Sequence, residues 1–126
     1  MSAALQALAE QLRGEDTPIA GHVVAGEGPS GPADEYEFVM EAVREGYLLH
    51  YGESRILSGQ DPDLALLAGD YLYALGLDRL AAMGDTDAVA VLSELISRCA
   101  QLHAEGRGDE VDPLWDEAGR RIGAIS

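Results

Sequence analysis

Three residues that could carry chemistry, His50, Glu53 and Arg55, lie in one short stretch of the chain. A histidine and a carboxylate can exchange protons near neutral pH, and an arginine can bind an anion. Together they would suit a small acid/base and anion-binding cluster. Their closeness in sequence is its only support, so a standalone enzyme ranks last among the functions we consider.

No other arrangement of residues points to catalysis or to a metal. The histidines His22, His50 and His103 are far apart, and none lies in a His-x-x-x-His or Glu-x-x-His spacing. The sequence contains no Ser-His-Asp elbow, P-loop or dinucleotide-binding glycine pattern. The acidic run 108–112 is better explained as favourable charge at the start of a helix. We therefore expect no catalytic residue and no metal site in this chain.

The segment 61–84 is the most informative element. Asp61 suits an N-cap, Pro62 suits the first helical position, and Gly84 suits a helix end. Between them the side chains are apolar almost all round, except for Asp63, Asp70, Asp78 and Arg79. Such a helix requires neighbours on most of its surface. The pattern predicts a buried helix whose surroundings are completed by a partner subunit.

Helical periodicity predicts four further helices, at about 3–12, 34–51, 87–105 and 110–122, and hence an all-α fold of about five helices. In the helix at 34–51 the apolar face includes Val39 and Val43, and the glutamates, Glu45 among them, are expected outside. We divide the chain into a short N-terminal helix at 1–13, a Gly/Pro-rich linker at 14–33 and a helical domain at 34–126. The apolar patch 19–24 is expected to dock on the core.

Composition narrows the choice of partner. The chain has 126 residues, with 23 acidic against 8 basic side chains and a net charge of -15. This acidity argues against nucleic acid and against anionic membrane surfaces as partners. The single cysteine, Cys99, is expected to be buried and suits a reducing compartment. Without a signal peptide or a run long enough to span a bilayer, the expectation is a cytoplasmic protein with no integral membrane segment.

The run 65–72, Ala-Leu-Leu-Ala-Gly-Asp-Tyr-Leu, with the Gly-Asp turn at Gly84-Asp85, resembles one helix of the trans-isoprenyl diphosphate synthases. In that all-helical family this helix follows the first aspartate-rich region and contributes to the dimer interface. The resemblance implies a truncated isoprenyl-synthase-like bundle with a buried central helix at a subunit interface. The residues it implies for that interface are Leu67, Asp70, Tyr71, Tyr73, Ala74 and Leu77.

The chain departs from the family where the metal ligands should lie. Full-length synthases hold Mg²⁺ against a diphosphate with two aspartate-rich motifs. Here the region before the Gly-Asp helix has His50, Tyr51 and Glu53 in place of an aspartate pair, and Arg55 stands alone. The chain thus resembles the short noncatalytic subunit of heteromeric long-chain polyprenyl diphosphate synthases. The resemblance implies a regulatory role in isoprenoid biosynthesis. The chain would form a heterodimer with a catalytic subunit, which holds the Mg²⁺, and would help to set product length.

The same apolar helix allows a different function. It would pair equally with its own copy across a two-fold axis, giving a homo-oligomeric binding or scaffold protein unrelated to prenyl transfer. In either case Asp70 has an interface or structural role rather than a catalytic one. If it is buried, it needs an arginine or a helix N-terminus as its partner.

Overall fold

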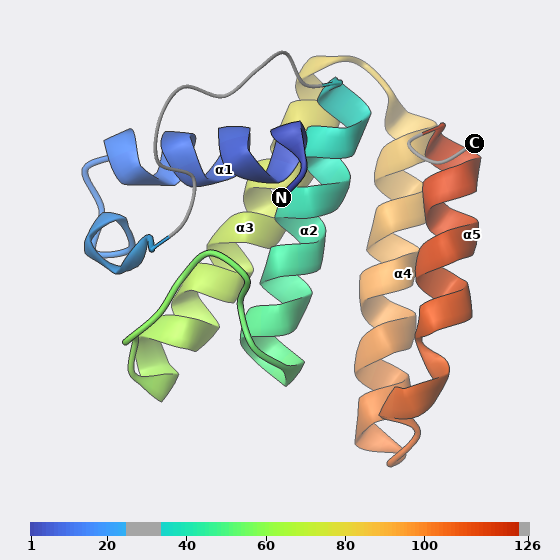
Figure 1. The fold of residues 1–126 in the computed structure, drawn as a ribbon. Helices are drawn as coiled ribbons and strands as arrows, with labels where there is room; N and C mark the ends of the chain where they lie inside the picture. The colour runs from blue at the N-terminus through green and yellow to red at the C-terminus, as the bar shows by residue number, and fades with distance from the viewer. Residues whose placement is uncertain (25–33, 124–126) are drawn as a thin grey trace. The chain divides into compact units, whose positions relative to one another are not determined.

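The computed structural model describes residues 1–24 and 34–123, and within them it confirms the all-α prediction (Figure 1). Five α-helices and two 3-10 turns make up the regular structure of these residues, with one isolated β-bridge. The chain forms two compact units, residues 1–76 and 77–126, which divide within the third helix. The centre of the predicted linker, 25–33, lies outside the described residues.

The first unit is built on α1 (Ala3–Gly14), α2 (Glu35–Tyr51) and most of α3 (Pro62–Ala82). Each helix begins at a side chain that accepts from exposed backbone N–H groups, as is usual at an N-cap. Ser2 caps α1, Asp34 caps α2, and the Oδ1 of Asp61 accepts from the backbone of Leu64 at 2.8 Å. The predicted ends of these helices agree closely with the observed ones.

The core of the first unit lies where α1 packs against α2 and α3 (Figure 1). It is made of leucines and small residues from α1, with Phe38, Ala42 and Leu49 of α2 and Ala68 and Leu72 of α3. The predicted docking of the 19–24 patch is confirmed, because Ile19 is buried in this core.

A short cross-link joins this patch to the loop after α2. Val23 forms an isolated antiparallel bridge with Leu57. The N–H of Val24 donates to the carbonyl of Ile56, and the N–H of Ser58 donates to that of His22, both at 2.9 Å. The 52–60 loop is therefore held against the N-terminal segment by backbone hydrogen bonds.

Within the single chain, α2 is more thoroughly buried than α3, and the predicted completion of the surroundings of α3 by a partner subunit stays a prediction. Buried positions of α2 face several directions and include Phe38, Val39 and Glu45. The buried positions of α3 follow a single stripe at 68, 69, 72, 76 and 80. The reason is that α3 packs through small residues on one side, while apolar side chains on its other side are exposed to solvent.

The second unit contains α4 (Thr86–Ala104), the 3-10 turn η2 (Gly108–Glu110) and α5 (Asp112–Ile122), which pack against one another (Figure 1). The Oδ1 of Asp85 caps α4 by accepting from the backbone N–H of Ala88 at 3.0 Å. The buried side chains of this unit include Leu92 and Leu95 of α4 and Trp115 of α5. The predicted burial of Cys99 is confirmed. In the part of the chain that the structure describes, no helix is both long and apolar enough to cross a membrane.

Candidate functional site

In the first unit α2 and α3 approach each other closely where glycines of both helices meet. A Cβ added at Gly46 would lie 2.8 Å from the carbonyl oxygen of Gly69 and 2.7 Å from the ring of Tyr73. A Cβ added at Gly76 would lie 2.7 Å from Val43. Real side chains do not tolerate such distances, so these glycines are required by the close approach. The Gly-Asp pair that carries the family resemblance therefore has a packing role through Gly69.

His50 and Asp70 connect the two helices beside this crossing. The Nε2 of His50 lies 3.1 Å from the Oδ1 of Asp70. Since an ionised carboxylate only accepts hydrogen bonds, Nε2 carries the proton in this pair. The imidazole also stacks on Tyr73, with ring centroids 5.3 Å apart and planes 18° apart. This pairing positions the His50 ring over the backbone of Gly69.

Asp70 is exposed, so the condition under which it would need an arginine or a helix N-terminus as its partner does not arise. Its side chain is 74% exposed, whereas that of His50 is 17% exposed. The position faces solvent because Gly69, its neighbour in sequence, is the residue turned toward α2. The partner of Asp70 is a histidine rather than an arginine or a helix N-terminus.

The outer face of α3 carries apolar side chains in contact with solvent. Leu66 is 50% exposed and Leu67 is 66% exposed, and Ala74 is exposed on the same helix. Tyr73 and Leu77 are half-buried. Large exposed leucines side by side on a helix are typical of an association surface when they form a patch. We call Leu66, Leu67, Asp70 and Ala74 the outer face of α3.

Tyr71 turns inward from this face. Its hydroxyl donates to the Oε2 of Glu15, just after the end of α1. The hydrogen bond, with partial burial and the carboxylate charge, raises the pKa of Tyr71 from 10.0 to about 12. Tyr71 thus fastens α3 to α1.

A buried carboxylate organises the loop after α2. Glu45 is fully buried, although its position was predicted outside. Its Oε1 accepts from the hydroxyl of Ser54 at 2.6 Å and from the backbone N–H of Arg55 at 3.0 Å. Its Oε2 accepts from the Nε of Arg55 at 2.7 Å. The prediction was wrong because Glu45 shares the stripe 38, 42, 45 and 49, whose other members are core residues. A glutamate inside that stripe was the signal that would have revealed it.

Glu41 completes the ion pairs of Arg55. The Nη1 of Arg55 lies 3.2 Å from the Oε2 of Glu41. Burial raises the pKa of Glu41 above its ordinary value, and the charge of Glu45 adds to the rise, while Arg55 opposes it. Arg55 therefore serves two glutamates of α2 at once.

The structure does not bring together His50, Glu53 and Arg55 as a cluster. His50 pairs with Asp70, Arg55 pairs with the α2 glutamates, and Glu53 is exposed. The imidazole of His50 and the guanidinium of Arg55 thus bind different carboxylates. Within the described residues, no group of three or more histidine, cysteine, aspartate or glutamate side chains is arranged to hold a metal ion.

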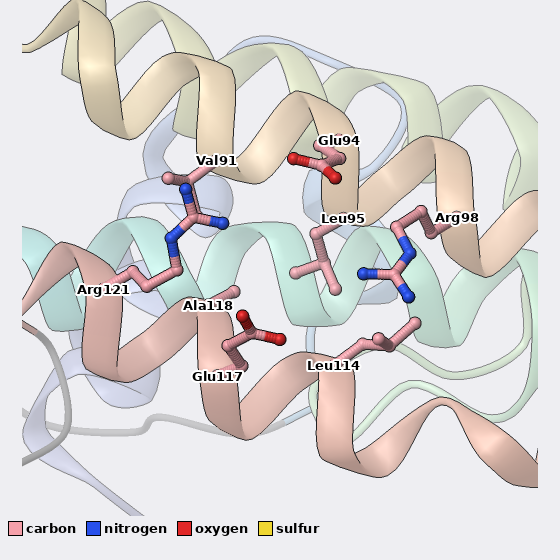
Figure 2. Close-up of a pocket in the computed structure, with 8 residues that line it drawn as sticks. All are labelled: Val91, Glu94, Leu95, Arg98, Leu114, Glu117, Ala118 and Arg121. Atoms are coloured by element: carbon pink, nitrogen blue, oxygen red, sulfur yellow. The ribbon is translucent and has the colours of Figure 1, made fainter.

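The second unit carries a shallow groove between α4 and α5 (Figure 2). Its floor is apolar, with Leu95 and Ala118 buried. Glu94 and Arg98 border it on α4, and Glu117 and Arg121 border it on α5 (Figure 2). The sequence patterns that we considered gave no indication of this groove, because its charged residues are an ordinary exposed pattern on each helix taken alone.

Comparison with known proteins adds no relative: no family model, curated protein or solved structure matches the chain.

Proposed function

We propose that the chain is a noncatalytic helical subunit that binds a catalytic polyprenyl diphosphate synthase through the outer face of α3 and helps to set the length of its product. The observation that carries the proposal is the exposure of Leu66 and Leu67 on the helix that bears the Gly-Asp motif. Fully burying a leucine is worth about 1.5–3 kcal/mol, so a partner that covers both gains substantial binding energy.

The packing beneath this face supports a role in presentation rather than in chemistry. Gly46 and Gly69 let α3 lie close to α2, and the bond from Tyr71 to Glu15 fixes α3 to the end of α1. The exposed leucines therefore project from a helix anchored on its opposite side. A rigid, pre-formed surface loses little conformational entropy when it binds.

The residues that could do chemistry are occupied in structural pairs. Asp70 accepts from His50, and Arg55 is bound by Glu45 and Glu41. In the proposed complex the Mg²⁺ and both aspartate-rich motifs belong to the catalytic subunit. This chain supplies binding surface and shape to the pair.

The test is co-purification of a tagged chain from its native cell with identification of what comes with it. We expect an aspartate-motif prenyl diphosphate synthase to accompany the wild type and to be lost with Leu67→Arg. The matched control is Val24→Arg, which changes an apolar side chain that is 63% exposed and lies outside α3. Synthesis by the recovered synthase, with and without this chain, then reports whether product length changes.

Recovery of only further copies of the chain would overturn this proposal. If that self-association were also lost with Leu67→Arg, the alternative function, a homo-oligomeric helical binding or scaffold protein, would take its place. The same exposed leucines favour this alternative, because two copies of one apolar helix face can pair across a two-fold axis.

A further inference from the structure

The groove between α4 and α5 carries charged side chains that are not paired with one another. Glu94 and Arg98 lie one helical turn apart on α4, as do Glu117 and Arg121 on α5 (Figure 2). Across residues 1–24 and 34–123, the structure records no ion pair for any of these four. All four are exposed along the groove. By contrast, Arg55 and Arg107 are held by carboxylates of their own.

The balance of charge at the groove is unusual for this chain. The protein has a net charge of -15 and only 8 basic side chains. Two of these arginines border the groove together with two glutamates, so the charges of the four side chains sum to zero. A second copy approaching most other surfaces would meet acidic side chains and be repelled. At this groove a second copy would meet two arginines as well as two glutamates, so the repulsion is smaller there.

The spacing of the charges makes the surface complementary to itself. If a second copy lies antiparallel across a two-fold axis, Glu94 of one copy faces Arg98 of the other at both ends of the contact. The pair Glu117 and Arg121 on α5 has the same property. A ligand of one charge sign would instead require a groove bordered by one sign. Equal numbers of opposite charges at one-turn spacing meet the self-complementarity that an isologous contact between helices requires.

We propose that the α4–α5 groove is a homodimer interface, in which Glu94 and Arg98 of one copy form ion pairs with Arg98 and Glu94 of a second copy. Packing two such helix pairs gives a four-helix arrangement, with Val91 and Leu114 added to the shared apolar centre. This interface is separate from the outer face of α3, so it goes beyond the proposed function and does not depend on it.

The first measurement is sedimentation equilibrium of the full chain over a range of concentrations. We expect a concentration-dependent dimer at about 0.15 M salt, where the long-range repulsion between two acidic chains is already screened beyond about 8 Å. It should weaken at about 1 M salt, where the screening length falls to about 3 Å and the ion pairs are screened as well. A chain that remains monomeric at every concentration overturns the proposal. A dimer with no dependence on salt overturns the ion pairs as its basis.

Charge reversal then identifies the surface. Glu94→Arg and Arg98→Glu each place like charges opposite one another in a homodimer, which raises Kd by about tenfold or more. An equimolar mixture of the two variants restores opposite charges, so it forms a heterodimer. Circular dichroism verifies that each variant keeps its helix content. Failure of the mixture to associate, or an unchanged dimer for either variant alone, overturns the proposal.

Matched controls lie on the same helix pair outside the groove. Asp116→Arg and Arg120→Glu make the same changes of charge at exposed positions of α5 that do not line the groove. They are expected to leave the dimer in place. Leu67→Arg is also expected to leave it in place, and this separates failure of the groove proposal from failure of the α3 proposal. Loss of the dimer with Leu67→Arg would assign self-association to α3 instead.

Discussion

Glu45 and Arg55 form an ion pair at 2.7 Å in which the carboxylate is fully buried and the guanidinium is 40% exposed. The pair connects the middle of α2 to the loop that leads to α3. Ser54 and the backbone of Arg55 also donate to Glu45, so three donors of the loop converge on one side chain. A single buried charge thus determines the path of the chain between the two helices of the proposed binding unit.

Removing the arginine of this pair should destabilise the protein strongly. Arg55→Ala leaves Glu45 buried without its cation, and we expect a loss of about 3 kcal/mol, the low end for a broken buried pair because Arg55 is partly solvated. Urea unfolding followed by circular dichroism measures it. Arg120→Ala, at an exposed position of α5, should change stability by less than about 0.5 kcal/mol. Equal stability of the two variants would contradict a structural role for the pair.

A methyl group at the helix crossing should be destabilising. Gly46→Ala places its Cβ against the backbone of Gly69, which cannot move without shifting α3, and we expect a loss of about 1–3 kcal/mol. Gly14→Ala is the control, since a Cβ there has nothing within 4 Å. Thermal unfolding should show a lower Tm for Gly46→Ala and an equal or higher one for Gly14→Ala. A higher Tm for Gly46→Ala would show that the helices do not approach this closely.

The bond from Tyr71 to Glu15 should give a distinctive alkaline titration. With a pKa raised from 10.0 to about 12, Tyr71 contributes stability that is complete below pH 10 and is lost as the pH rises through about 12. Ultraviolet absorbance of phenolate formation in the folded protein should show a late step that Tyr71→Phe removes. Tyr51→Phe, at a tyrosine that is 41% exposed, should leave that step in place. If Tyr71→Phe leaves the late step unchanged, the bond is not formed in solution.

Glu41 should oppose stability as the pH rises. Its pKa is raised above 4.5, so the folded state binds its proton more tightly than the unfolded state does. Stability from this group is complete below pH 4.5 and falls as the pH rises through the raised value. Glutamine carries no charge at any pH, so Glu41→Gln should lack this fall. The free energy of unfolding of the variant, measured in urea at each pH, should therefore increase relative to that of the wild type from acid to neutral pH. Glu37→Gln, at an exposed position, should follow the wild type.

The helices could be predicted from the sequence because their signals are local. Asp61 accepts at the start of α3 as its side-chain chemistry predicted, and Asp34 and Asp85 cap the helices whose starts were predicted at about 34 and 87. The apolar stripe predicted for the last helix is buried as well. It includes Val111, just before α5, and Trp115 and Ile122 within α5. Capping and periodicity depend on neighbours within one or two turns, which the sequence contains directly.

The burial of individual side chains could not be predicted in the same way, because it depends on contacts between distant segments. Glu45 was placed outside on the evidence of its charge, although Arg55 and Ser54 compensate that charge from the following loop. For Asp70 the sequence left burial open, because a carboxylate stands there among apolar neighbours. The inward side of α3 is the side on which Gly69 and Gly76 contact α2. The pattern of residues within α3 alone does not reveal this contact.

The backbone bridge between the 19–24 patch and the 52–60 loop has a consequence for hydrogen exchange. The amide protons of Val24 and Ser58 are held by carbonyls across that bridge, and Ser54 and Arg55 of the same loop are anchored on Glu45. Two segments so joined open as one cooperative unit. Their amides should therefore exchange with deuterium at a common rate, and releasing the loop from α2 should accelerate exchange at Val24, more than thirty residues away in the chain.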